Sequence, residues 1–296
     1  MNLDEVWVAG EALIDFIPNS IGEFQAIVGG GPANTARALA KLGVHTYFIG
    51  GLSSDKYGLH IKEILTDSSV DLTLASESEL RTATAQVSID QTGKVKYFFD
   101  LKDTSTFDFN QEWLPRGKPA VLHLGTLATV VEPGASNLLN WAKSIDTTRV
   151  FDPNVRPSVF GTRAEYRASV ERFIAISDVV KLSIEDLMWL YPDLSSASEL
   201  LAKGPSLIVV THGAEGLEGI HSHGSVFVPG VEIELVDTVG AGDTVGAILV
   251  ESIFYHGLAS LIANLEEVLG RAAKAAAITC SRAGANPPWR EELDQA

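Results

Sequence analysis

The chain has 296 residues, 46% of them hydrophobic, and a formal net charge of −16. This length and apolar content suffice for one large α/β domain. The acidic charge argues against a basic surface for nucleic acid or membrane, and the single cysteine excludes an internal disulfide. The N-terminus lacks the pattern of a signal peptide, and no apolar run reaches the ~18 residues of a membrane span, so we expect a cytoplasmic protein.

The first elements lead from an apolar strand to a glycine-rich turn. The strand, predicted over 6–9, is followed by Gly10-Glu11-Ala12-Leu13-Ile14-Asp15, and an alternating strand over 24–28 returns to Gly29-Gly30-Gly31-Pro32-Ala33-Asn34. A helix is predicted over 33–42. Sugar hydroxyls need fixed donors and acceptors, which a carboxylate and a carboxamide supply. A solvated turn would account for the same residues.

Residues 82–109 interrupt the alternation of strands and helices. Two alternating stretches flank Asp90-Gln91-Thr92-Gly93, the turn sequence of a β-hairpin. With the strands near the N-terminus, this hairpin predicts a small sheet that projects from the body. We therefore expect a single domain over 1–296 with lid strands inserted at about 12–28 and 82–108.

Elsewhere strands and helices follow one another regularly. We predict strands over 46–49, 121–124, 150–152, 179–182 and 207–211, and helices over 57–65, 133–145, 163–176 and 183–190. This order predicts an α/β fold with a central, mostly parallel, doubly covered β-sheet. Ligands of such sheets bind at the carboxyl ends of the strands. A set of polar residues falls at or just after predicted strand ends, which predicts a shared site: Asp15, Asn154, Arg156, Thr211 and Asp243.

A second glycine-rich stretch lies at 237–243, Asp-Thr-Val-Gly-Ala-Gly-Asp. Apolar and acidic residues alternate over 231–235, which predicts a half-buried strand, and helical spacing begins after Asp243. Gly240, Ala241 and Gly242 would let a phosphate reach the N–H groups at the helix start. A carboxylate in an anion site can serve as the base for the attacking group, which indicates phosphoryl transfer. An ordinary Asp N-cap would explain Asp243 alone.

The two glycine-rich stretches resemble, in order and spacing, the paired motifs of the ribokinase-like (PfkB) carbohydrate kinase family. The resemblance extends from Gly10 to Ala285 and implies the ribokinase-like fold, with ATP as phosphoryl donor and Mg²⁺ as cofactor. It implies Asp243 as catalytic base and the N–H groups of 240–243 as anion hole. It also implies that the sugar is bound by Asp15, Gly29, Gly30 and Asn34. The bacterial fructokinases look most similar, which implies transfer to a primary hydroxyl of fructose.

Two further segments look like family motifs. Asp152-Pro153-Asn154-Val155-Arg156 is similar to the family's Asp-Pro-Asn-x-Arg, which implies that Arg156 touches a phosphate or a substrate carboxylate; arginine suits both anions. Thr211-His212-Gly213 resembles a Thr-x-Gly turn, which implies that Thr211 and Gly213 contact ATP.

The segment 183–186 has two interpretations, one structural and one as a metal site. Ser183-Ile184-Glu185-Asp186 reads as a helix capping box. Many family members carry Asn-x-x-Glu here, linked to the Mg²⁺ site, so the resemblance implies that Glu185 or Asp186 holds Mg²⁺ through water. Some members also bind K⁺ between the Asp237 region and the loop 281–286. Pro287-Pro288 stands where some of those supply a hydroxyl, which argues against potassium activation.

Three rival interpretations remain. The acceptor of the same reaction would be 2-keto-3-deoxygluconate, ribose or a nucleoside, or the chain would be a catalytically silent sugar or nucleotide sensor. A dinucleotide-binding oxidoreductase would need Gly-x-Gly-x-x-Gly after the first strand, where this chain has Glu11-Ala12-Leu13. A lid sheet with one apolar face often pairs with a second copy, so a homodimer is expected.

Overall fold

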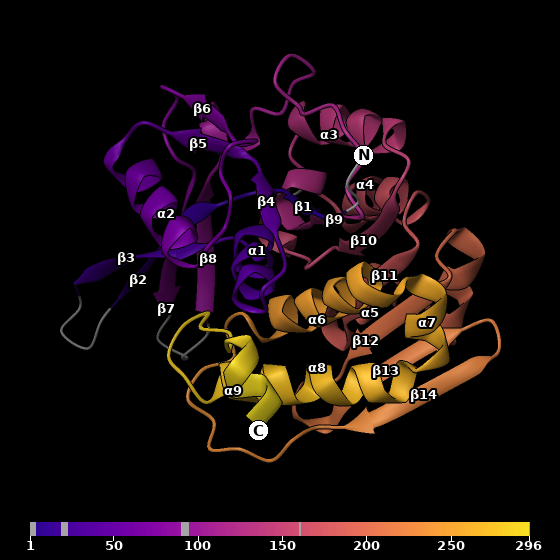
Figure 1. The fold of residues 1–296 in the computed structure, drawn as a ribbon. Coiled ribbons are helices and arrows are strands. Elements are labelled where there is room, and N and C mark those ends of the chain that lie inside the picture. Colours follow the sequence, from indigo (N-terminus) through magenta and orange to yellow (C-terminus); the bar gives the residue numbers. More distant parts are fainter. Residues whose placement is uncertain (1–3, 19–22, 90–94, 160, 296) are drawn as a thin grey trace.

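A computed structural model describes residues 4–18, 23–89, 95–159 and 161–295. Within these residues an eight-stranded sheet has the order β14-β13-β12-β11-β10-β9-β1-β4 (Figure 1). Neighbours from β4 to β12 are parallel, and β13 and β14 are antiparallel. The strands are β1 (Val6–Ala9), β4 (Thr46–Ile49), β9 (Val121–Gly125), β10 (Thr148–Asp152), β11 (Val179–Ser183), β12 (Leu207–Thr211), β13 (Gly216–His221) and β14 (Gly224–Pro229).

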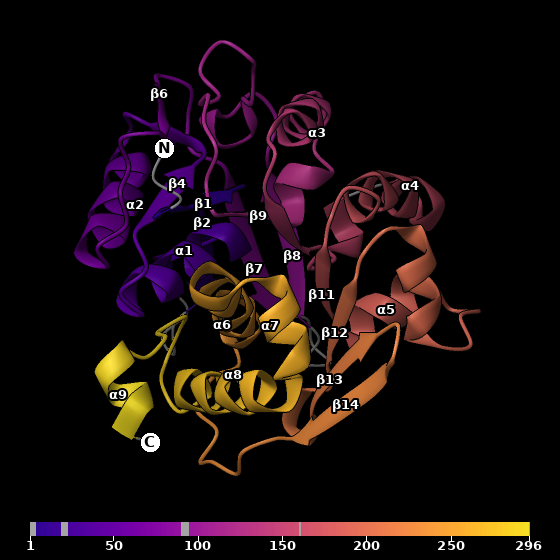
Figure 2. The same ribbon diagram turned by 45° about the vertical axis from the view of Figure 1, so that its right-hand side comes forward.

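Helices cover both faces of this sheet (Figure 2). One face carries α1 (Gly31–Lys41), α2 (Lys56–Asp67), α6 (Ala241–His256), α7 (Leu258–Ala263) and α8 (Leu265–Cys280), and the other carries α3 (Gly134–Ser144), α4 (Arg163–Ile174) and α5 (Ile184–Leu190). The last helix, α9 (Arg290–Gln295), packs against α8. The mostly parallel, doubly covered sheet predicted from the sequence is confirmed.

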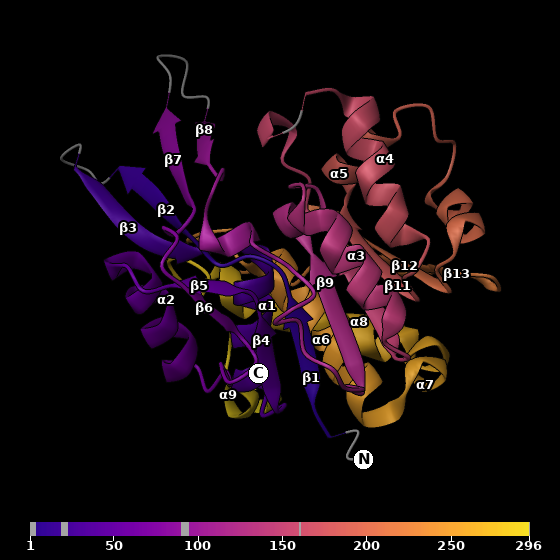
Figure 3. The same ribbon diagram turned by 90° about the horizontal axis from the view of Figure 1, so that it is seen from above.

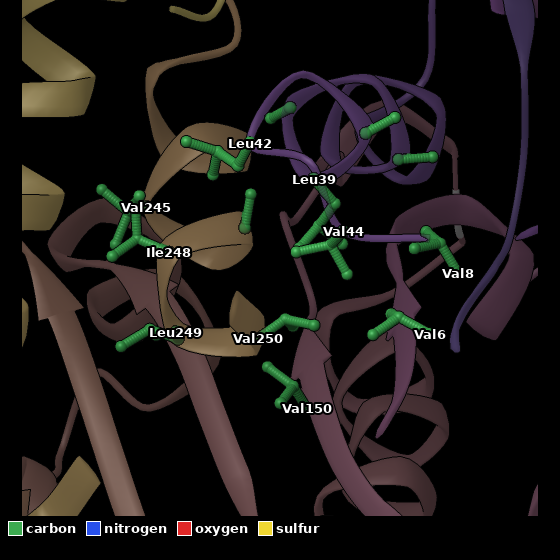
Figure 4. Close-up of a cluster of buried hydrophobic side chains, with 14 of the residues drawn as sticks. Val6, Val8, Leu39, Leu42, Val44, Val150, Val245, Ile248, Leu249 and Val250 are labelled. Carbon is green, nitrogen blue, oxygen red and sulfur yellow. The ribbon is translucent and has the colours of Figure 1, made fainter. Parts of the chain in front are cut away.

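Alternate residues of each strand enter opposite halves of the core. Val6 and Val8 of β1 face α1 and α6, while Trp7 and Ala9 belong to the cluster beneath α3 and α4. Figure 4 shows the first half, where Leu39 of α1 and Leu249 of α6 lie over the sheet. Strands buried on both faces read as nearly continuous apolar runs, as these do.

A second, four-stranded sheet stands out from the body (Figure 3). Its order is β3-β2-β7-β8; β2 is antiparallel to β3 and parallel to β7, and β7 is antiparallel to β8. The strands are β2 (Leu13–Pro18), β3 (Phe24–Gly29), β7 (Thr84–Ile89) and β8 (Val95–Asp100). The turn predicted at 90–93 lies outside the described residues. A short pair, β5 (Gly51–Ser53) and β6 (Ser76–Ser78), lies nearby.

The strand predicted over 231–235 is wrong. This segment is an irregular connection between β14 and α6, and all five residues are exposed. Among the described residues no strand pairs with its backbone; the next two N–H groups, of Val236 and Asp237, donate to the carbonyl oxygen of Cys280. Alternating apolar and polar residues indicate a buried and an exposed face only in a strand that is part of a sheet, and here neither face of the segment is covered.

None of the described helices has the length and apolar character that crossing a membrane requires.

The packing of α6 generates a stability prediction. Leu249 is fully buried between α6 and the sheet, so Leu249→Ala should lower the free energy of unfolding by about 2–5 kcal/mol through lost burial and a cavity. Denaturant unfolding measures the change. Leu59→Ala on α2 is the control, since that side chain is 57% exposed. Equal losses in the two variants would contradict this account of the core.

Candidate functional site

The site lies where the strand order reverses. From β1 the chain passes to β4 on one side, whereas β9 joins β1 on the other side. In an open α/β sheet, the loops that follow strands on either side of such a switch point leave a crevice at their carboxyl ends. The two glycine-rich stretches open α1 and α6, which pack against each other above this point.

One hydrogen bond joins the two stretches. Nδ2 of Asn34, in the first turn of α1, donates to Oδ2 of Asp243, in the first turn of α6, across 2.9 Å. Both side chains are buried, at 7% exposure each. The hydroxyl of Thr35 also donates to the carbonyl oxygen of Asp243, at 3.4 Å. Residues 209 positions apart in sequence therefore form one constellation.

The start of α6 has the form of an anion site. Gly240 adopts a left-handed conformation with φ 80° and contributes no side-chain cap. The N–H of Ala241 donates to the carbonyl of Thr238 at 3.3 Å, and the next two N–H groups, of Gly242 and Asp243, precede the first intrahelical bonds. Backbone N–H groups and the positive end of the helix dipole together attract an anion.

Asp243 is held in a mixed electrostatic environment. Its pKa is raised to about 6, mainly by burial and to a smaller extent by the negative charge of Asp152. Lys181, the hydrogen bond from Asn34 and the charge of Arg156 act in the opposite direction. A carboxylate with this balance is ionised at neutral pH and is a stronger base than an exposed aspartate.

Gly31 is where three parts of the site converge. A Cβ on Gly31 would lie 3.1 Å from Oδ1 of Asp243, 3.1 Å from Nδ2 of Asn154 and 2.6 Å from Cγ2 of Thr126. Asn154 follows β10 with a positive φ of 34°, and Thr126 follows β9 with φ 54°. The absence of a side chain at Gly31 therefore leaves room for Asp243 and Asn154 to face one another.

Asp15 belongs to the projecting sheet. The prediction that it follows a strand end is wrong, because it lies inside β2 and pairs with Ile27 of β3. Its carboxylate occupies the space above Gly29, where a Cβ would come within 2.0 Å of Oδ2. Burial raises the pKa of Asp15 to about 6, and the positive charge of Arg156 opposes this rise. Gly30, with φ 105°, caps α1 close to the carbonyl of Glu11.

Arg156 and Asn154 form a local unit. Nη1 of Arg156 donates to the side-chain and backbone oxygens of Asn154, and the charge of Arg156 acts on both Asp15 and Asp243. The arginine thus brings positive charge toward both ends of the crevice.

Thr211 and Gly213 lie at the same edge of the sheet. Thr211 is the last residue of β12 and is in register with Ser183, the last residue of β11. A Cβ on Gly213 would meet nothing within 4 Å. Within the part of the chain that the structure describes, no hydrogen bond joins either one to Asp243, so these two flank the Asn34–Asp243 pair.

The two candidate metal residues differ. Ser183 and Asp186 form the predicted capping box. The Asp186 carboxylate accepts the N–H groups of Val155 and Ser183, and burial together with the charge of Asp152 raises its pKa. Each of its oxygens keeps a lone pair, which fits a Mg²⁺ ion that retains its waters. Glu185 is exposed, and no group of three or more metal-ligating side chains occurs among the described residues.

The family model for pfkB family carbohydrate kinases matches residues 3–292. The chain belongs to this family.

Individual pfkB relatives agree in sequence and fold. Fructokinase of Salmonella typhimurium is 30% identical, with 98% of each chain covered. Fructokinase of Vibrio cholerae O395, solved in a fructose-, ADP- and calcium-bound form, superposes with TM-score 0.87 at 27% identity over 99% of this chain and 98% of that one. Aminoimidazole riboside kinase of Salmonella enterica, complexed with aminoimidazole riboside and an ATP analogue, shares the fold at TM-score 0.84, 23% identity and 98% coverage of both chains. The predicted family and ribokinase-like fold are confirmed.

Several buried polar residues near this site were not predicted from the sequence. Lys181, Asp152 and His123 are buried in or at the end of central strands, and the carboxylate of Glu11 accepts the N–H groups of Leu127 and Ala128. Burial raises the pKa of Glu11 to about 7. The available signal was a charged or titratable residue within an apolar strand, which is rarely buried without a partner.

Gly31→Ala tests the convergence of the site. The added methyl group would displace the Asp243 and Asn154 side chains and press on the buried Thr126, so kcat/KM with a sugar acceptor should fall at least tenfold and the melting temperature should also fall. Gly270→Ala in α8 is the matched control, because a Cβ there meets nothing within 4 Å. Unchanged turnover in Gly31→Ala would contradict the close packing described.

Proposed function

We propose that the chain transfers the γ-phosphoryl group of ATP to a primary hydroxyl of fructose. The observation that carries the proposal is the Asn34–Asp243 hydrogen bond, which unites a carboxamide suited to a sugar with a carboxylate at an anion-binding helix start. The family supplies the reaction class. Fructose as acceptor is supported by relatives that are fructokinases, one of them solved with fructose and ADP.

The chain's own groups have distinct roles in this proposal. Asp243 accepts the proton of the attacking hydroxyl, and the N–H groups of 240–243 stabilise charge on the transferred phosphoryl group. Asp15, Gly29, Gly30 and Asn34 bind the sugar, and Arg156 contacts a phosphate. Thr211 and Gly213 contact ATP at the carboxyl end of β12. Bound Mg²⁺ would neutralise phosphate charge, and Asp186 would hold it through water.

The projecting sheet is the lid in this proposal. Residues 12–28 and 82–108 would close over the sugar and exclude water, which would otherwise take the phosphoryl group. Among the side chains described for this sheet, Phe24 is 49% and Phe98 63% exposed, and the strand register puts both on one face; Ile27, 37% exposed, lies on the other. A second copy pairing over the first face would cover Phe24 and Phe98. Light scattering should therefore give a homodimer at micromolar protein, and a monomer would refute the pairing.

Other acceptors are the alternatives. Aminoimidazole riboside kinase has the same fold, so a riboside, ribose or 2-keto-3-deoxygluconate would use the same base with different lid contacts. A catalytically silent sensor would bind sugar or ATP without turnover. The intact Asp243 at an anion-binding turn favours a catalyst.

An ADP-release assay across a sugar panel separates these functions. Native protein should turn over fructose, and Asp243→Ala should lower kcat by about 10²–10⁴-fold, the usual contribution of a general base. Turnover of another sugar alone would replace the acceptor and keep the mechanism. No ADP release with any sugar, combined with a melting temperature raised by ATP or sugar, would establish the sensor.

The pKa of Asp243 predicts an acid limb. Its value of about 6 means that the carboxylate is increasingly protonated, and unable to accept a proton, as the pH falls below 6. Asp15, which binds the sugar in this proposal, has a pKa of about 6 as well, so we expect kcat/KM to decline by ten- to a hundredfold per pH unit below pH 6. His123 does not contribute, because burial lowers its pKa to about 3 and it stays neutral throughout. A limb near pH 4 would contradict the buried environment.

A further inference from the structure

Lys181 is a buried cation directly beneath the anion-binding turn. It occupies the middle of β11, between Val180 and Leu182, and its side chain is 5% exposed. Nζ donates to Oδ2 of Asp152 across 2.6 Å and to the carbonyl oxygen of Gly242 across 3.2 Å. The ammonium group therefore ties the end of β10 and the first turn of α6 to β11.

We propose that Lys181 is a positioning residue for phosphoryl transfer: by holding the Gly242 carbonyl it fixes the turn that presents the N–H groups and the carboxylate of Asp243. The proposal rests on the function proposed above. It gives a specific role to a side chain outside the groups assigned to sugar and ATP binding.

The local geometry supports this role. A Cβ on Gly242 would lie 3.0 Å from Nζ of Lys181, so the ammonium group sits immediately against this glycine. Within a helix, the Gly242 carbonyl already serves the N–H four residues later. The bond from Lys181 is an additional one, made to the strand below, and it restrains the orientation of the peptide units at the helix start.

The surrounding charges give Lys181 a second task. Three carboxylates act on it, from Asp152 of β10, Asp186 of α5 and Asp243 of α6. From β9, His123 contributes no positive charge, since burial keeps it neutral. Arg156, in the loop after β10, is the other cation acting on Asp243. Lys181 thus offsets negative charge below the position that the phosphates would occupy.

Stability alone does not account for the Lys181–Asp152 pair. Removing two charges from water costs several kcal/mol each, and replacement of a buried ion pair by apolar residues is often neutral or stabilising. A pair placed at this cost under a catalytic turn is better explained by what it orients. The arrangement also predicts that its two members act on Asp243 with opposite sign.

Three variants test the proposal with ATP and the preferred sugar: Lys181→Met, Asp152→Asn and the double variant. Lys181→Met should lower kcat at least 100-fold with the sugar KM within threefold, and should move the acid limb to higher pH because a cation facing Asp243 is lost. Asp152→Asn should move the limb to lower pH, because a carboxylate is lost. The limb shifts report the charges around Asp243, whereas kcat reports the positioning. A merely structural pair would lower the melting temperature in both variants and leave kcat at neutral pH within threefold of native protein.

The double variant is less prone to unfold than either single variant, because it removes both members of the buried Lys181–Asp152 pair and leaves neither without the other. It should fold and retain the deficit in kcat. Glu251→Gln is the matched control. Glu251 lies in α6, the helix that Lys181 contacts, and accepts hydrogen bonds from Arg271. Its substitution should lower the melting temperature without changing kcat. Wild-type kcat in Lys181→Met or in the double variant would overturn the proposal. Limbs that shift together or not at all would contradict the charge balance described for Asp243.

Failure of the proposed function would be distinguishable. If native protein phosphorylates no sugar, titration calorimetry with the non-hydrolysable ATP analogue AMP-PNP measures nucleotide binding at the turn without any reaction. The double variant should then bind the analogue at least tenfold more weakly than native protein. Equal affinity would overturn the role of Lys181 independently of the reaction.

Discussion

The hydrogen bond between Asn34 and Asp243 depends on two helices starting at the same place. α1 and α6 pack side by side on one face of the sheet, and their first turns meet above the switch point between β1 and β9. Small residues make this approach possible, since Gly31 leaves no side chain between the two turns. The rest of the site is arranged around this junction, with the projecting sheet on one side and the ends of β10 to β12 on the other.

Burial gives the junction its chemical character. The carboxylates of Asp152 in β10 and Asp243 in α6 are buried in the crevice, and that of Asp15 in β2 lies partly buried beside it. Buried carboxylates repel one another and favour protonation unless cations are near. Lys181 from below and Arg156 from the rim supply that charge. The fold that excludes water therefore also supplies the counter-charges, one from β11 and one from the loop after the neighbouring β10.

Much of this arrangement could be predicted from the sequence. Alternating strands and helices gave the sheet, because each strand buried on both faces is a short apolar run and each helix carries an apolar stripe. The two glycine-rich stretches could be assigned because each stands directly before a predicted helix, where missing side chains let a ligand approach the backbone. The failures concern information that is not local. Residues 231–235 alternate like a strand but have no partner, and Asp15 lies within a strand because its pairing with β3 and β7 depends on the distant hairpin. The bonds of Lys181 join three elements, which spacing along the chain cannot reveal.

The separation of the two halves of the site has a consequence for how the protein is made. β1, β9 and β10 leave the ribosome long before α6, yet α6 covers their apolar residues Val121 and Val150. A nascent chain of about 240 residues thus has its central strands but leaves uncovered the part of one face that α6 will cover, and it lacks the second half of the Asn34–Asp243 pair. Such long-range contacts fold slowly, and exposed apolar surface promotes aggregation. Synthesis of α6 therefore both closes the core and completes the site, so that a chain able to bind its substrates is also one that has hidden this face.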